Sequence, residues 1–190
     1  YGKLVHYNFQ QDHDTGEDDH SDGIVTRYIE ISLTRNPGVP GHLDMNQGNG
    51  MLYVADTGGG RVLWVNTQDP NVTISDIRGA ESQMEPLDGY NRATSVDWGI
   101  LASGLSSPSG IKLHQGVLFV SQNGNGKITG FNLNEDGKNF TDSRTVNTNA
   151  GSIMGLEIGP EGKLWYVDSE KNRVIRLDTY QDTDFDEVRD

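Results

Sequence analysis

The stretch LYVADTGGGRV at residues 52–62 sets the pattern of this chain, because it recurs twice more without gaps. The later copies are LFVSQNGNGKI at residues 118–128 and LWYVDSEKNRV at residues 164–174. Each copy is a short apolar run, a polar turn, a basic residue and the start of a second apolar run, which is typical of a β-hairpin. Three equivalent hairpins predict a chain built from repeated β-units.

Further strands are expected on both sides of each hairpin. The runs PGHLDM (residues 40–45), PSGIKL (residues 108–113) and IMGLEI (residues 153–158) precede the three hairpins. Fourth strands are expected at residues 95–101 and 143–147. Units of four strands and about 40–50 residues are typical of the blades of a β-propeller. No stretch keeps a helical period, so the sequence predicts an all-β protein.

Composition excludes several classes of function. The 190 residues include 15 Lys and Arg against 28 Asp and Glu, a formal net charge of −13. Such an acidic chain lacks the cationic surface that nucleic acids require. No apolar run is long enough for a transmembrane helix, so we expect no membrane insertion. Cysteine is absent, and no phosphate-binding motif lies between a strand and a helix, so we expect no nucleotide cofactor.

The paired runs PGHL…LYVADTGGGRV and IMGL…LWYVDSEKNRV resemble the NHL repeat, and the resemblance covers residues 39–178. It implies a β-propeller of four-stranded blades, with about three to four blades present as part of a six-bladed ring. Residues 1–38 would supply outer strands of a preceding blade and an acidic loop with histidines. Residues 39–106 and 107–151 would each form a blade, and residues 152–190 an incomplete blade with an acidic tail. A four-bladed closure, or two chains closing one ring, are the alternatives.

The resemblance also assigns structural positions. Asp56 and Asp168 match the aspartate of the repeat, and Arg61 and Arg173 match its basic residue. We expect the basic residues to pair with aspartate or carbonyl groups at the blade turns. Gln122 replaces the aspartate in the middle unit, so that unit is expected to lose whatever its aspartate would pair with.

His42 is the first candidate for chemistry. It stands where the other two units have Gly110 and Gly155, so its side chain is expected to project into the central channel. The resemblance to the peptide-amidating lyase branch implies a metal held on the axis by such histidines; the alternative is a channel-lining histidine bound to water. Asp44 and Glu157 alternate with the inner positions and are expected to face away.

An acidic loop at residues 11–23, QDHDTGEDDHSDG, is the second candidate. Carboxylates suit Ca²⁺, and mixed histidine and carboxylate sets suit Zn²⁺. The alternative is a solvated loop that only contributes charge. The candidate ligands of a calcium or zinc ion there are His13, His20, Asp12, Asp14 and Asp18.

Two N-glycosylation sequons, at Asn71 and Asn139, favour an extracellular glycoprotein. The repeats and the lack of a complete catalytic set favour a binding or assembly module for a protein or glycan partner, with self-assembly as a further option. The alternatives that the resemblance implies are a metal-dependent lyase like peptidylamidoglycolate lyase and a gluconolactonase-like hydrolase.

Overall fold

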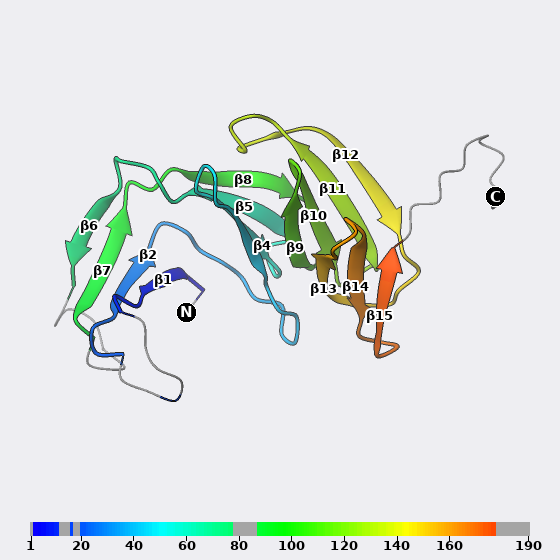
Figure 1. Ribbon diagram of the computed structural model, residues 1–190, viewed down its shortest axis with the longest axis horizontal. Helices are drawn as coiled ribbons and strands as arrows, with labels where there is room; N and C mark the ends of the chain where they lie inside the picture. Colours follow the sequence, from blue (N-terminus) through cyan, green and yellow to red (C-terminus); the bar gives the residue numbers. More distant parts are fainter. Residues whose placement is uncertain (1, 12–15, 17–19, 78–86, 178–190) are drawn as a thin grey trace.

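The computed structural model describes residues 2–11, 16, 20–77 and 87–177, and in these the chain is all-β, with strands and turns and no helix. This confirms the prediction that the chain is all-β. The strands form four small sheets that follow one another along an open arc, with β6, β8 and β12 along its convex side (Figure 1). The acidic tail at residues 178–190 and most of the acidic loop lie outside the described residues.

The second and third sheets are antiparallel and four-stranded, and the fourth has three strands in its described part. In spatial order, the second sheet consists of β3 (Leu43–Asn46), β4 (Met51–Asp56), β5 (Arg61–Asn66) and β8 (Trp98–Ser103). The third consists of β9 (Pro108–His114), β10 (Val117–Gln122), β11 (Lys127–Leu133) and β12 (Phe140–Asn147). The fourth consists of β13 (Ile153–Ile158), β14 (Leu164–Asp168) and β15 (Arg173–Leu177). Strands predicted from the repeats are present in all three sheets.

The first sheet is built from two distant segments. Its spatial order is β1 (Leu4–Asn8), β2 (Ile24–Tyr28), β7 (Gly89–Thr94) and β6 (Thr73–Asp76). The chain leaves the second sheet after β5, forms β6 and β7 alongside β2, and returns as β8. The β2–β7 pairing is parallel, whereas the neighbouring pairings are antiparallel. The sequence did not reveal this inserted hairpin.

Glu30 fastens the inserted hairpin where the chain turns back from β7. Its two carboxylate oxygens accept hydrogen bonds from the backbone amides of Ser95 and Val96, each at 3.0 Å. These backbone hydrogen bonds lower the pKa of Glu30, because they favour the ionised carboxylate. The turn after β2 and the turn after β7 are therefore linked by a charged group.

The turn inside each repeated hairpin explains one shared sequence position. Gly60, Gly126 and Asn172 have φ angles of 62°, 66° and 51°. Glycine adopts this left-handed conformation without steric cost, and asparagine tolerates it better than most residues. The carbonyl of Gly126 accepts a hydrogen bond from the hydroxyl of Thr148 at 2.7 Å, which ties this turn to the chain after the fourth strand.

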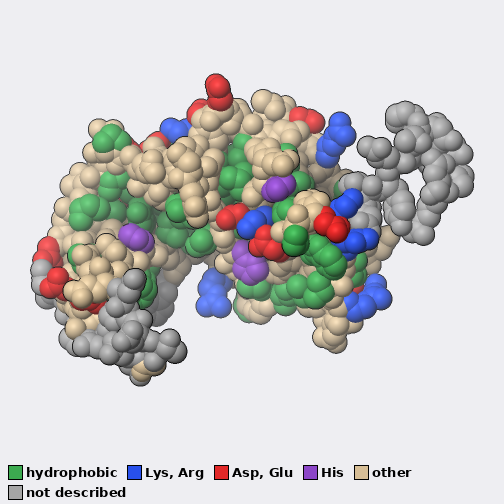
Figure 2. Space-filling model, in the orientation of Figure 1, with side chains coloured by type: hydrophobic (Ala, Val, Ile, Leu, Met, Phe, Trp, Pro, Cys, Tyr) green, Lys and Arg blue, Asp and Glu red, His purple; other side chains and the backbone are tan. Residues whose placement is uncertain are grey.

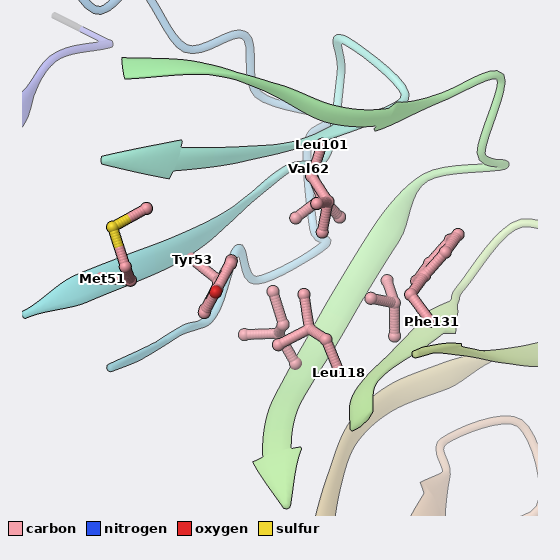
Figure 3. Packing of buried hydrophobic residues seen from close by; sticks show 8 residues of the cluster. Met51, Tyr53, Val62, Leu101, Leu118 and Phe131 are labelled. Atoms are coloured by element: carbon pink, nitrogen blue, oxygen red, sulfur yellow. The ribbon is translucent and has the colours of Figure 1, made fainter. Parts of the chain in front are cut away.

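Apolar side chains fill the space between successive sheets. Between the second and third sheets, Tyr53 on β4 and Leu118 on β10 point towards each other and are fully buried (Figure 3). Val62 and Phe131 belong to the same cluster. Corresponding clusters lie between the first and second sheets and between the third and fourth. Face-to-face packing of sheets thus holds the arc together.

Candidate functional site

Three charged residues from three different sheets meet on the first strands β3, β9 and β13. Lys112 Nζ donates a hydrogen bond to Glu157 Oε1 at 2.9 Å and lies 3.9 Å from Asp44 Oδ2. The same Asp44 oxygen accepts a hydrogen bond from the Leu113 amide at 2.7 Å. Asp44, Lys112 and Glu157 occupy the same position in the three repeat units. We call these three residues the central row.

Electrostatics favour the ionised forms of Lys112 and Glu157. The hydrogen bond to Glu157, assisted by the nearby charge of Asp44, raises the pKa of Lys112. Partial burial acts to raise the pKa of Glu157, but hydrogen bonds from Lys112 and from the Ile158 amide outweigh it and lower that pKa. All three side chains stay partly exposed, so a polar ligand could reach them.

The sequence analysis did not predict the central row. Asp44 and Glu157 both reach Lys112 where the first strands of neighbouring sheets lie side by side. Acidic, basic and histidine side chains gather near the middle of the face in Figure 2, in the region of β9 and β13. An alignment of the three first strands contains the acid–base–acid pattern, which is the signal that could have revealed it.

His42 is exposed and lies two residues before Asp44 of the central row. A Cβ atom at Gly155 would come within 3.0 Å of His42 Cε1, so the ring lies directly over that glycine. His42 and Glu157, together with Trp165 and Val174, line a hollow of about 260 Å³. The hollow therefore combines an imidazole and a carboxylate with apolar walls.

The metal hypothesis finds no assembled ligand set in the described part of the chain. There, no three histidine, aspartate or glutamate side chains are grouped closely enough to hold an ion. His42 alone would provide one ligand. His20 lies with its ring centroid 5.1 Å from that of Phe9. The other candidates, His13, Asp12, Asp14 and Asp18, lie outside the described residues.

Asp56 anchors the connection between the first and second sheets. Its buried carboxylate accepts hydrogen bonds from the Thr34 amide at 2.7 Å, the Gly59 amide at 3.2 Å and Arg61 Nε at 2.8 Å. Arg61 also donates to the carbonyl of Ser32 at 2.9 Å. In this unit Arg61 pairs with the turn aspartate and with a carbonyl group, as the repeat pattern predicts.

Gln122 keeps part of this arrangement in the third sheet. Its side-chain oxygen accepts a hydrogen bond from the Ser106 amide at 2.9 Å, in the connection that leads to β9. Its side-chain nitrogen donates to the Thr129 hydroxyl at 3.2 Å. We expected this unit to lose the partners of the missing aspartate. That expectation is wrong for the backbone hydrogen bond, because the amide oxygen of Gln122 can also accept it.

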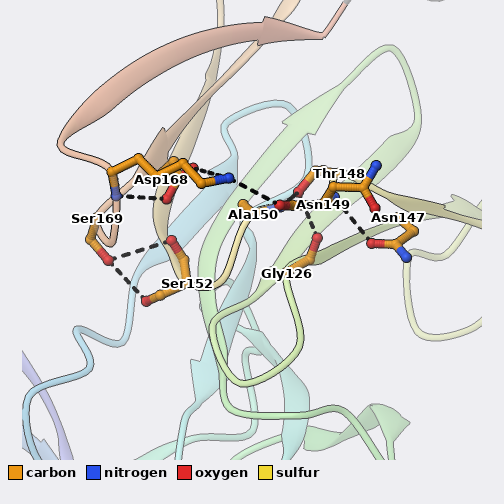
Figure 4. Close-up of polar contacts among 9 residues, drawn as sticks. Gly126, Asn147, Thr148, Asn149, Ala150, Ser152, Asp168 and Ser169 are labelled. Atoms are coloured by element: carbon orange, nitrogen blue, oxygen red, sulfur yellow. Dashed lines mark hydrogen bonds and ion pairs between the residues drawn. The ribbon is translucent and has the colours of Figure 1, made fainter.

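Asp168 differs from its counterpart in the second sheet. It is fully buried and accepts a hydrogen bond from the Lys171 amide at 3.1 Å, while its other oxygen lies 3.9 Å from Lys171 Nζ. Among the contacts of the described residues, this second oxygen has no hydrogen-bond donor. Arg173 is its partner in strand register but is exposed, so Lys171 is the nearest cation instead. Figure 4 shows this turn together with the hydrogen bond that the Ser169 hydroxyl donates to the Ser152 hydroxyl.

Both sequons are sterically accessible. Asn71 and Asn139 are exposed and lie in turns. The side-chain amide of Asn71 donates to Asp69 Oδ1 at 3.0 Å within its own turn, an exposed contact that a glycan could displace.

No protein-family model matches this chain, and a search of curated proteins found no relative. In the described part of the chain, there is no helix with the length and apolar character needed to cross a bilayer.

Proposed function

We propose that the four sheets are blades of an NHL-type β-propeller that acts as an extracellular binding module, with the central row as the contact point for a polar group of a protein or glycan partner. The observation that carries this proposal is the joining of one repeat position across three sheets by Asp44, Lys112 and Glu157. An ion pair with only a structural role needs two charges, whereas the central row has three, and all three side chains are partly exposed.

The geometry favours recognition over catalysis. Lys112 is held between two carboxylates, so it offers an oriented cation, and Glu157 and Asp44 offer acceptors on either side. The adjoining hollow adds an exposed aromatic wall at Trp165, which suits the apolar face of a sugar or an amino-acid side chain. Sheets in sequence along an arc, with first strands in contact, support the propeller arrangement.

Binding arrays test the role of the central row. The wild-type chain is applied to an array of neutral, sialylated and sulfated glycans and to an array of random peptides. Lys112→Ala is expected to reduce binding at least tenfold, since it removes the cation shared by both carboxylates. Lys138→Ala is the matched control, because Lys138 is similarly exposed and forms a 2.7 Å pair with Asp97 on another part of the surface.

The outcomes separate the alternatives. Binding that is lost in Lys112→Ala and kept in Lys138→Ala supports the proposal. Equal binding by all three proteins shows that the central row is not the contact point, and no binding by the wild-type chain to either array refutes the proposed recognition. Elemental analysis of the purified protein tests the metal-dependent alternatives, which require about one zinc or calcium ion per chain.

A further inference from the structure

One repeat position is filled differently in the second and third sheets. Trp64 on β5 and Gly130 on β11 are equivalent when the repeated hairpins are aligned. Trp64 pairs in register with Gly99 of β8, and a Cβ atom at Gly99 would come within 2.7 Å of the indole, so the ring lies over that glycine. The ring also packs against the apolar cluster between the second and third sheets. That junction therefore contains an indole that the next junction lacks.

A cavity of about 410 Å³ lies between the third and fourth sheets, where Gly130 replaces the tryptophan. Phe119, Gly130 and Arg144 line it from the third sheet and pair in register across β10, β11 and β12. The fourth sheet contributes a register row of three apolar side chains, which are Ile158, Leu164 and Leu177. Small-molecule sites have volumes of about 300–1,000 Å³, so the cavity is large enough for a ligand.

The walls of this cavity suit an aromatic ring. Phe119 is partly buried, and its Cε1 would be 3.4 Å from a Cβ atom at Gly130, so its ring edge lies against that glycine. Aromatic rings pack well against one another in offset and edge-to-face arrangements. At the preceding junction, Lys138 Nζ of the third sheet lies 5.0 Å from the centre of the Trp64 ring. At this junction the fourth sheet likewise supplies a cation, because Lys163 lines the cavity.

The charges that line the cavity favour an anionic group. Arg144 and Lys163 are two cations against one carboxylate, Glu161, in a chain whose net charge is −13. The side chain of Arg144 is 90% exposed, and its Nε lies 3.9 Å from Asp142 Oδ2, which is too long for a hydrogen bond. The guanidinium therefore has donors available at the edge of the cavity. A guanidinium can bind a carboxylate through two parallel hydrogen bonds.

We propose that the cavity between the third and fourth sheets binds a small aromatic carboxylic acid, with its ring beside Phe119 and its carboxylate on Arg144. Gly130 leaves the space that an indole takes in the second sheet, and the bound ring would fill it. Arg144 is the register neighbour of Gly130 and stands where the second sheet has Gly99, so ring and charge are recognised side by side. The proposal is independent of the central row, because none of those three residues lines the cavity.

Isothermal titration calorimetry with three probes tests the ligand class. Indole-3-acetate carries both the ring and the carboxylate, indole-3-acetamide keeps the ring without the charge, and cyclohexylacetate keeps the charge without an aromatic ring. The wild-type chain is expected to bind indole-3-acetate at least tenfold more tightly than either of the other two. Failure to bind indole-3-acetate, or equal affinity for all three probes, overturns the proposal.

Two variants locate the site. Gly130→Trp places in the third sheet the residue that Trp64 provides in the second, so it should fill the cavity and weaken indole-3-acetate binding at least tenfold. Ile74→Trp, at an exposed position of β6, is its matched control and should bind like wild type. Arg144→Gln should weaken binding of indole-3-acetate at least tenfold and leave the affinity for indole-3-acetamide within twofold. Arg173→Gln, at an exposed arginine of β15 outside the cavity, is its control.

The variants give clear outcomes. Losses confined to Gly130→Trp and Arg144→Gln support the proposal. Unchanged binding in Arg144→Gln, or an equal loss in Arg173→Gln, overturns it, because the carboxylate would then not be held at Arg144. Circular dichroism checks that Gly130→Trp is folded; if it is not, Arg144→Gln still decides, since its side chain is exposed. The array experiment on Lys112 has a separate readout, so the two proposals can fail independently.

Discussion

Replacing Asp56 by alanine should destabilise the fold strongly. The substitution leaves the amides of Thr34 and Gly59 without their acceptor and removes the partner of Arg61. Each of these two hydrogen bonds has a charged acceptor and contributes about 1.5–3 kcal/mol. Thr34 and Gly59 are themselves exposed, so water can reach their amides and the lower end applies, about 3 kcal/mol for the two. Arg61 is partly exposed and regains water, which keeps its contribution small. We therefore expect the free energy of unfolding to fall by about 3 kcal/mol.

Urea denaturation measures this loss. With a slope of about 3 kcal/mol/M, a loss of about 3 kcal/mol lowers the midpoint by about 1 M. Asp56→Asn should cost less, because an amide oxygen can still accept from the Thr34 amide, as Gln122 does for Ser106. Asp142→Ala, which removes an exposed carboxylate, should change the free energy of unfolding by no more than about 0.5 kcal/mol. A loss below about 1 kcal/mol for Asp56→Ala, or equal losses for alanine and asparagine, would refute the reasoning.

Three further outcomes are expected. Gly126→Ala should lower the free energy of unfolding by about 2 kcal/mol or more, because Gly126 has a left-handed backbone and a Cβ there would collide with the carbonyl oxygen of Ala150. Urea denaturation measures this loss, and an unchanged midpoint would contradict the turn geometry. Because the pKa of Glu30 is lowered in the folded protein, its stabilising contribution is present at pH values above the ordinary glutamate pKa and is lost as the pH falls through the folded pKa. Glu30→Gln should therefore flatten this part of the acid-unfolding curve, and an unaltered curve would show that Glu30 does not stabilise the turn after β7. Secretion from eukaryotic cells should add glycans at Asn71 and Asn139, and a mass that peptide N-glycosidase leaves unchanged would argue against modification.

Local features of the fold were predictable from the sequence. The repeated hairpins could be recognised because alternation and turn residues act over a few positions, as Gly126 and Asn172 illustrate. The inserted hairpin could not be recognised, because β7 pairs in parallel with β2, more than sixty positions earlier. No local pattern specifies such a pairing.

The candidate site was only partly predictable. Alignment of the three units showed that His42 takes the position that is glycine in the other two. The contact of its ring with Gly155 of the fourth sheet is visible only in the structure. The direction of Asp44 and Glu157 depends on how the first strands of different sheets converge, and alternation within one strand does not determine it. Lys112 gained its role only through this convergence.

The inserted hairpin couples two sheets that would otherwise be separate folding units. The first sheet cannot be completed until β7 has been synthesised, by which time β3, β4 and β5 of the second sheet already exist. Long-range pairings of this kind form late and slow the search for the native state. The first two sheets should therefore fold and unfold as one cooperative unit, whereas the third and fourth, each made from consecutive residues, can form as the chain emerges.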